Sequence, residues 1–426
     1  MKIVCCNKYF FVNGGTEKYL FRLLERLPHF GCEAIPFSVA YAGSAPSPYA
    51  GYFLPPPGRP GQTHYNTLGS GLDALTALPR LLGRAVWSLE AKRALHRLLD
   101  DLGEVDLGYI LNIYNYMSPS VITVFKERGL PVVMRLGDYH LLCLNYQLLR
   151  DNSPCQQCIT GAYWHGIAHR CVKNSLPASL VRGAAMYFQR LVGVYDQVDA
   201  FVAPCTFMRD KLVAGGFAAE KIHVIRQGVE TDGPPPSGDK GDYILYFGRL
   251  SPEKGLDMLL EAFQNLAPDV DLVLAGRGLG DYEAFLKGLV RPAFAGRVRF
   301  AGFLAEPALS GLVSRALFTV APSRWYDNAP LAVLESALQA TPVLAANIGG
   351  IPELIEDGIT GRLFAPDSVA DLTAKLAELL ARREALPAMG RAARERALRT
   401  GSLDTHLTQL LALFGTLGAK PRLSGR

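Results

Sequence analysis

The chain has 426 residues, of which 49% are hydrophobic and 19% charged, and its net charge is +5. This length exceeds what one hydrophobic core holds, so two or three domains are expected. The small positive charge argues against nucleic-acid binding, and no run of about 18 apolar residues predicts a membrane span. Because the N-terminus lacks a signal-peptide pattern, we expect a cytoplasmic protein whose cysteines stay reduced.

The first half of the chain alternates apolar strands with amphipathic helices. Strands are predicted at residues 2–6, 30–40, 106–113, 131–139, 198–205 and 221–229, and helices at 13–27 and 176–195. Gly14 and Gly15 join the first strand to its helix, and such a turn suits a phosphate, a sugar or plain close packing. Residues 43–70 are rich in Pro, Gly and Ser and predict a loop.

A basic helix is predicted within residues 77–101. Its cations recur at helical spacing, and they are Arg80, Arg84, Lys92, Arg93 and Arg97. Such a helix presents either a solvated face or a site for an anionic membrane or acceptor.

Four cysteines lie close together in a polar insertion at about 142–176, with a C-x2-C core. They are Cys143, Cys155, Cys158 and Cys171. Four thiolates at this spacing suit a structural zinc ion, with His165 and His169 as substitute ligands. Free thiols or a disulfide are the alternatives.

In the second half of the chain, predicted strands alternate strictly with helical segments. After a linker at 231–242, strands are predicted at 243–248, 271–276, 297–302, 317–321 and 342–346. This pattern predicts a parallel sheet covered on both faces, so both halves are doubly wound α/β domains that bind ligands at the carboxyl ends of their strands. We place the domains at 1–232 and 241–402, and expect a helix in 403–426 to return to the first domain.

Two cations follow the first strand of the second domain. Arg249 and Lys254 lie past its carboxyl end and before a helix, where a forked guanidinium and a compact ammonium suit a diphosphate.

A carboxylate pair, Asp327 and Glu335, lies farther along. Asn328 is predicted to cap the helix that contains Glu335. Gly349 and Gly350 follow the next strand, and a second helix is predicted to begin near Pro352, so that glycine amides face an anion. Carboxylates for hydroxyl groups beside an anion cradle indicate a nucleotide that carries a sugar.

Several segments together resemble the retaining glycosyltransferases of family 4. They are NGGTE near the N-terminus, GRLSPEKG, AGRGLG, the carboxylate pair and GGIPELIEDGITGRLF, and the match is strongest over 243–366. The resemblance implies the GT-B architecture, in which two Rossmann-like domains face each other across a cleft. It implies that the N-terminal domain binds the acceptor and the C-terminal domain binds the donor.

The resemblance also implies residue roles. Arg249 and Lys254 would bind the donor diphosphate, with Gly14 and Gly15 over it, and Glu335 would hold the ribose hydroxyls. The first carboxylate, usually Glu in the family, would contact the transferred sugar, and Asp327 is one methylene shorter. We also predict that Asn328, Leu331 and Gly350 bind the donor.

A second departure follows the fourth strand. The family often has a His-Asp pair there, whereas this chain has Gly137 before Asp138, with His140 two places later. Either Asp138 or His140 faces substrate, or the two are a capping Asp and a packed His. We include Asp138 among the catalytic candidates with Arg249, Lys254 and Asp327.

Two other patterns are weaker. Asp269 and Asp271 form an Asp-x-Asp, as in metal-dependent transferases, but they precede a strand at its amino end. Gly276, Gly278 and Gly280 depart from a dinucleotide-binding fingerprint and lack the acidic residue that should follow.

The sequence therefore predicts a retaining transferase that moves a sugar from a nucleoside diphosphate to an acceptor hydroxyl in polysaccharide or glycoconjugate synthesis. The acceptor would be a sugar or a lipid-linked molecule, with peripheral contact to an anionic membrane, and catalysis would need no cofactor. An NAD-dependent oxidoreductase and a non-catalytic sugar-nucleotide-binding protein are the alternatives.

Overall fold

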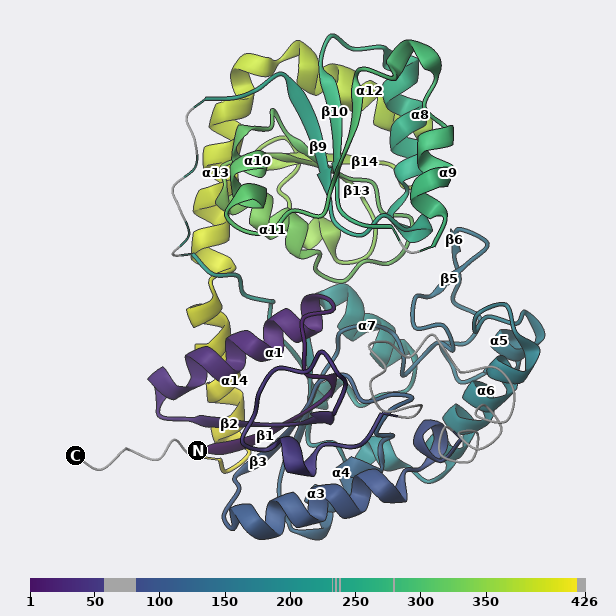
Figure 1. The fold of residues 1–426 in the computed structure, drawn as a ribbon, viewed down its shortest axis with the longest axis vertical. Coiled ribbons are helices and arrows are strands. Elements are labelled where there is room, and N and C mark those ends of the chain that lie inside the picture. Colours follow the sequence, from purple (N-terminus) through teal and green to yellow (C-terminus); the bar gives the residue numbers. More distant parts are fainter. Residues whose placement is uncertain (57–81, 232, 234–235, 237–238, 279, 420–426) are drawn as a thin grey trace.

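The computed structural model describes residues 1–56, 82–231, 233, 236, 239–278 and 280–419. Within this part the chain forms two α/β domains, one above the other in Figure 1, each built on a six-stranded parallel sheet. This confirms the predicted fold class. The remaining small sheet is a two-stranded antiparallel pair, β5 (Leu149–Arg150) with β6 (Ser153–Pro154).

The N-terminal sheet has the strand order β2-β1-β3-β4-β7-β8. Its strands are β1 (Lys2–Tyr9), β2 (Glu33–Val39), β3 (Leu107–Ile110), β4 (Val132–Arg135), β7 (Ala200–Ala203) and β8 (Ile222–Val224). The helices of this domain are α1 (Gly15–Arg26), α3 (Leu89–Leu102), α4 (Ser120–Glu127), α5 (Trp164–Ala168), α6 (Leu176–Leu191) and α7 (Thr206–Ala214). Both faces of the sheet are buried, because alternate residues of β1 belong to different cores: Val4 and Cys6 to one, Ile3 and Cys5 to the other.

The C-terminal sheet has the order β11-β10-β9-β12-β13-β14. Its strands are β9 (Tyr243–Phe247), β10 (Asp271–Ala275), β11 (Val298–Gly302), β12 (Thr319–Ala321), β13 (Val343–Ala346) and β14 (Gly361–Phe364). The helices are α8 (Leu256–Leu266), α9 (Tyr282–Gly288), α10 (Ala308–Arg315), α11 (Leu331–Leu338), α12 (Val369–Ala381) and α13 (Leu386–Thr400).

Two local predictions in this domain were wrong. The helix expected near Pro352 is a single 3-10 turn, η7 (Ile351–Glu353). Helix α11 begins at Leu331, after Pro330, so Asn328 lies outside it and does not cap it. The apolar face of α11 is buried, since Leu334, Ala337 and Leu338 pack with Ala393 and Ala397 of α13.

The C-terminal helices connect the two domains. Helix α13 lies along the C-terminal domain and α14 (Leu403–Thr416) runs along the N-terminal domain (Figure 1). Leu407, Leu410 and Phe414 of α14 share a core with Ile3 of β1 and Leu107 of β3. In the described residues, no helix is long and apolar enough to cross a bilayer.

The predicted basic helix at 77–101 is not a continuous cationic face. Arg80 lies outside the described residues. Arg84 is buried and bonded to Glu90, and Lys92 forms an ion pair with Glu127. Two of its described cations are therefore satisfied within the protein, whereas Arg93 and Arg97 are exposed. Contact of this helix with an anionic membrane stays a prediction.

Candidate active site

Loops from the two domains meet between the sheets. Asn328 Nδ2 donates to the carbonyl oxygen of Gly137 at 2.7 Å, so the loop after β12 contacts the loop after β4. A Cβ added to Gly15 would lie 3.6 Å from Leu331 Cδ1, so the start of α1 faces the start of α11. Because β4 and β12 reach this region with their carboxyl ends, it is the place where a doubly wound fold binds ligands.

Arg249 and Lys254 lie on this side of the C-terminal domain, directly after β9. Arg249 is half exposed, and its Nη2 lies 3.2 Å from Glu253 Oε1. Lys254 Nζ lies 2.5 Å from Asp327 Oδ2, which also accepts from Ser323 Oγ at 3.2 Å. The structure thus joins two of the predicted site residues, Lys254 and Asp327, in one buried ion pair.

Glu335 projects from α11 toward the other domain. In the described chain its carboxylate forms neither a hydrogen bond nor an ion pair. Burial raises the pKa of Glu335, whereas the positive charges of Lys18 and Arg22 on α1 act to lower it. This carboxylate is therefore available to accept hydrogen bonds from a ligand beside the start of α1.

The first turn of α1 offers backbone donors to the same region. The helix begins at Gly15, and no side chain caps its N-terminus. The N–H groups of a first turn have no partners within their own helix, and they carry the positive end of the helix dipole. Gly14 and Gly15 therefore suit an anion.

Gly350 does not provide the predicted free amide. Its N–H donates to the carbonyl oxygen of Asp327 at 2.7 Å. A Cβ on Gly350 would lie 1.8 Å from the carbonyl oxygen of Asn328, and one on Gly349 would lie 2.4 Å from that of Asp327. The glycine pair allows the chain to pass directly beneath the Asp327–Asn328 loop, so the assignment of the Gly350 amide to a phosphate is corrected.

Asp138 and His140 form one buried cluster on the N-terminal side. His140 Nδ1 lies 2.7 Å from Asp138 Oδ1, and Tyr114 donates its hydroxyl to Asp138 Oδ2 at 2.9 Å. Burial acts to raise the pKa of Asp138, but the charge and hydrogen bond of His140 hold it below the usual value, assisted by Lys8 and Tyr114. Among the residues that the structure describes, Nε2 of His140 has no hydrogen-bond partner.

Lys8 and Tyr114 were missed by the sequence analysis. Lys8 Nζ lies 4.5 Å from the ring centroid of Tyr114, and the rings of Tyr9 and Tyr116 are also close. Burial lowers the pKa of Lys8, and the charges of Asp138 and Glu17 oppose this shift. In the sequence, only the position of Lys8 near the end of the first strand could have indicated that it lies at the site.

The four cysteines of the insertion surround one small cavity together with His165 and His169. The cavity measures about 10 Å³, at or below the room that one water molecule needs. All four cysteines are free thiols. As the side chains are placed, no group of three or more His, Cys, Asp or Glu residues in the described chain is arranged to hold a metal. The structural zinc stays a prediction.

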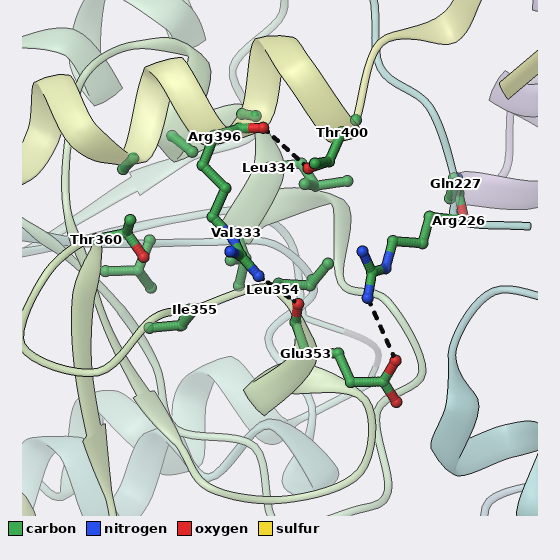
Figure 2. A pocket seen from close by; sticks show the side chains of 15 residues that line it. Arg226, Gln227, Val333, Leu334, Glu353, Leu354, Ile355, Thr360, Arg396 and Thr400 are labelled. Atoms are coloured by element: carbon green, nitrogen blue, oxygen red, sulfur yellow. Dashed lines mark hydrogen bonds and ion pairs between the residues drawn. The ribbon is translucent and has the colours of Figure 1, made fainter. Parts of the chain in front are cut away.

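A separate pocket lies behind α11 and is shown in Figure 2, with Arg226, Glu353 and Arg396 on its walls. It measures about 20 Å³, room for about one water molecule. It is therefore too small for a sugar nucleotide.

The structure explains the two weaker sequence patterns, the Asp-x-Asp pattern and the run of glycines that begins at Gly276. Asp271 begins β10 and pairs with Arg299, while Asp269 pairs with Arg383, so both lie at the amino end of the sheet. A Cβ on Gly276 would lie 1.8 Å from the carbonyl oxygen of Gly248, so this glycine permits close approach of two strand ends.

The family model matches the C-terminal half, and the relatives match about half of the chain. Residues 230–396 match the family Glycosyl transferases group 1. The D-inositol 3-phosphate glycosyltransferase of Mycolicibacterium paratuberculosis is 34% identical over 238 residues, which cover 52% of this chain and 53% of that protein. The glycogen synthase of Mycobacterium tuberculosis is 32% identical over 239 residues, covering 53% and 57%. The chain thus spans about half the length of the curated relatives it matches.

Solved structures extend the similarity of fold to the whole chain. A glycosyltransferase from Rickettsia africae has a TM-score of 0.66 at 16% identity, with 98% of each chain covered. Anabaena HepE in complex with UDP-glucose has a TM-score of 0.66 at 18% identity, covering 98% of this chain and all of that one. Residues 230–396 are therefore a glycosyl transferases group 1 region, set in a two-domain fold that the whole chain shares with solved glycosyltransferases.

Proposed function

We propose that this protein is a retaining glycosyltransferase that moves a sugar from a nucleoside diphosphate donor to an acceptor hydroxyl. The observation that supports this best is the arrangement of three residues in the C-terminal domain: Arg249 and Lys254 follow β9, and Glu335 lies on α11, whose start faces the uncapped start of α1. The group 1 family match spans all three residues.

The leaving diphosphate gains negative charge as the bond to the sugar breaks. Arg249 and Lys254 would stabilise that charge, together with the N–H groups of the first turn of α1. Lys254 would exchange its contact with Asp327 for a phosphate oxygen. Asp327 would then be free to accept from a hydroxyl of the transferred sugar, and Glu335 would accept from the ribose.

The acceptor belongs, in this proposal, to the N-terminal side of the cleft. Asp138, held in place by His140 and Tyr114, is the carboxylate available there to orient an acceptor hydroxyl. Retention follows from the resemblance to family 4, and polysaccharide or glycoconjugate synthesis is the expected setting. A UDP-sugar is the first donor to test, since Anabaena HepE was solved with UDP-glucose.

The test is a panel of UDP-, GDP- and ADP-sugars with the full chain, read by thermal shift. A donor at about 100 times its dissociation constant adds about 2.7 kcal/mol of stability. The donor that binds is then supplied with sugar acceptors, and the anomeric configuration of the product is read by NMR. Absence of any shift across the panel would contradict a nucleotide-sugar enzyme, and an inverted product would contradict retention alone.

A further inference from the structure

Arg135 is a buried arginine that forms no ion pair with any described residue. It ends β4, and its side chain is 6% exposed. Nη2 donates to Gln227 Oε1 at 2.8 Å, and the guanidinium lies 4.4 Å from the ring centroid of Tyr19. In the part of the chain that the structure describes, Nε and Nη1 donate no hydrogen bond and the side chain forms no ion pair.

The charge of Arg135 is poorly compensated inside the protein. Glu17 is within its electrostatic range, but burial raises the pKa of Glu17, and its Oε1 already accepts from Asn7. A buried guanidinium is costly unless an anion and hydrogen-bond acceptors reach it. An external anion would meet that requirement.

The unused Nη1 lies beside Gly137, in the loop after β4 that contacts the C-terminal domain. A Cβ added to Gly137 would be 3.4 Å from Arg135 Nη1 and 3.5 Å from Thr16 Oγ1. Gly137 contacts the other domain through Asn328, and Thr16 follows Gly15 in the first turn of α1. The guanidinium thus fills the space left by the absent side chain at position 137, beside the helix start that favours anions.

We infer that Arg135 is a donor-binding residue, which gives the diphosphate a third cation from the N-terminal domain. This rests on the proposed function. Arg249 and Lys254 would hold the diphosphate from one domain, while Arg135, Thr16 and the first-turn N–H groups of α1 would hold it from the other. Because a diphosphate carries more negative charge than a monophosphate and offers the guanidinium fork the oxygens of a second phosphate, Arg135 favours a diphosphate.

The experiment compares the parent with Arg135→Met, Arg135→Lys, Arg249→Ala and Arg84→Met. Each is titrated by calorimetry with UDP, GDP, ADP and the three matching monophosphates. For the base that the parent prefers, Arg135→Met should weaken diphosphate binding about tenfold or more, as expected for a lost charge-assisted bond. The monophosphate should be affected less, and Arg135→Lys should fall between because it keeps the charge without the fork.

Arg84→Met is the matched control, since it removes a buried guanidinium that is bonded to Glu90 outside the cleft, and it should bind like the parent. Parental affinity in folded Arg135→Met overturns the inference. If that variant does not fold, parental affinity in Arg135→Lys overturns it instead. Loss of affinity in Arg249→Ala but not in Arg135→Met leaves the proposed function standing, whereas a parent that binds none of the nucleotides removes both.

Discussion

The two cations of the C-terminal domain that are assigned to the donor diphosphate each lie against a carboxylate of that domain. Glu253, which is buried and accepts from Ser251 Oγ, contacts Arg249, and the buried Asp327 contacts Lys254. A fixed carboxylate orients a long, flexible cation, and so reduces the entropy that the cation loses on meeting a phosphate. Glu253 and Asp327 are therefore candidate positioning residues, and Asp327 is in addition a candidate ligand contact.

Arg249→Ala should lower kcat about 100-fold or more, with a higher donor KM. The physical reason is that charge on the leaving diphosphate grows in the transition state, so the lost contact matters most there. Steady-state kinetics with the donor found in the panel measures both constants. Arg299→Ala removes an exposed arginine paired with Asp271 at the opposite end of the sheet and should leave both constants unchanged. A change in KM alone would mean that Arg249 binds the ground state and the transition state equally well.

Glu335→Gln should weaken binding of the free nucleoside diphosphate about tenfold, because an ionised carboxylate accepts from two ribose hydroxyls and an amide does so less well. Calorimetry with the ribonucleotide and its 2′-deoxy form sharpens the test. The parent should prefer the ribonucleotide, and the variant should lose most of that preference. An equal preference in both proteins would remove Glu335 from the ribose site.

The sequence could place residues at strand ends but not their packing partners. Arg249 and Lys254 follow a strand, so their side of the domain was predictable from the rule for doubly wound sheets. The Gly350 amide could not be assigned, because its acceptor is the Asp327 carbonyl on a different loop. The surroundings of Arg135 were hidden for the same reason, since Gln227 and Tyr19, which contact it, come from two distant segments.

At the scale of elements, the regular alternation of apolar strands with amphipathic helices was enough to predict most of the fold. Long apolar strands and amphipathic helices were found at their places, whereas β14 was missed. This strand has four residues and begins with Gly361, where a Cβ would lie 2.4 Å from the carbonyl oxygen of Val343. When only the sequence is known, a glycine that is required for close pairing of two strands is taken for a turn residue. Helix α14 shows a clear apolar face, and its docking depends on a buried histidine.

His406 of α14 should make folding stability depend on pH. Its Nδ1 lies 2.7 Å from the Arg226 carbonyl oxygen, which can only accept, so Nε2 accepts from the Tyr19 hydroxyl, also at 2.7 Å. Burial lowers the pKa of His406 from 6.5 to about 4. Because the folded pKa is lower than the unfolded one, the stability is complete above pH 6.5 and falls as pH drops toward 4, by about 3 kcal/mol.

Urea unfolding at several pH values measures this dependence. His406→Gln keeps a donor for Arg226 and an acceptor for Tyr19 but does not ionise, so it should lose less stability than the parent between pH 6.5 and 4. His29→Gln, at an exposed histidine, should follow the parent. If His406→Gln loses stability as steeply as the parent, the imidazole does not carry the effect.

The cysteine insertion should bind about one zinc ion per chain. The four thiols line one cavity, and burial raises the pKa of Cys143 to about 11 and that of Cys158 to about 12, so binding would release protons. Metal analysis of protein purified without a histidine tag is the measurement. Cys155→Ser should lower the zinc content, and Cys32→Ser, a cysteine outside the insertion, should not. Metal-free protein with unchanged melting under reducing conditions would leave the thiols as packing residues.

At the scale of the whole molecule, Glu353 joins the two domains. Its two carboxylate oxygens accept from the backbone N–H groups of Thr206 at 3.0 Å and Phe207 at 2.8 Å, which are the first two residues of α7. Figure 2 shows the same carboxylate pointing toward Arg226, 3.9 Å away. A side chain of the C-terminal domain thus satisfies two N–H groups that α7 leaves without partners, and its charge complements the dipole of that helix.

This contact should set how strongly the domains stay closed. Removing a carboxylate from a helix N-terminus costs about 1 kcal/mol, and here that energy belongs to closure, because the carboxylate and the helix lie in different domains. Glu353→Ala should therefore increase the radius of gyration measured by small-angle X-ray scattering, and saturating donor should reverse the increase. Donor KM should rise, since apparent affinity falls with the fraction of closed protein.

Glu356→Ala is the matched control: this side chain pairs with Arg396 inside the C-terminal domain and should change neither quantity. A scattering profile and KM equal to those of the parent in Glu353→Ala would show that closure depends on other contacts between the domains, such as Asn328 with Gly137 and Gln156 with Tyr326.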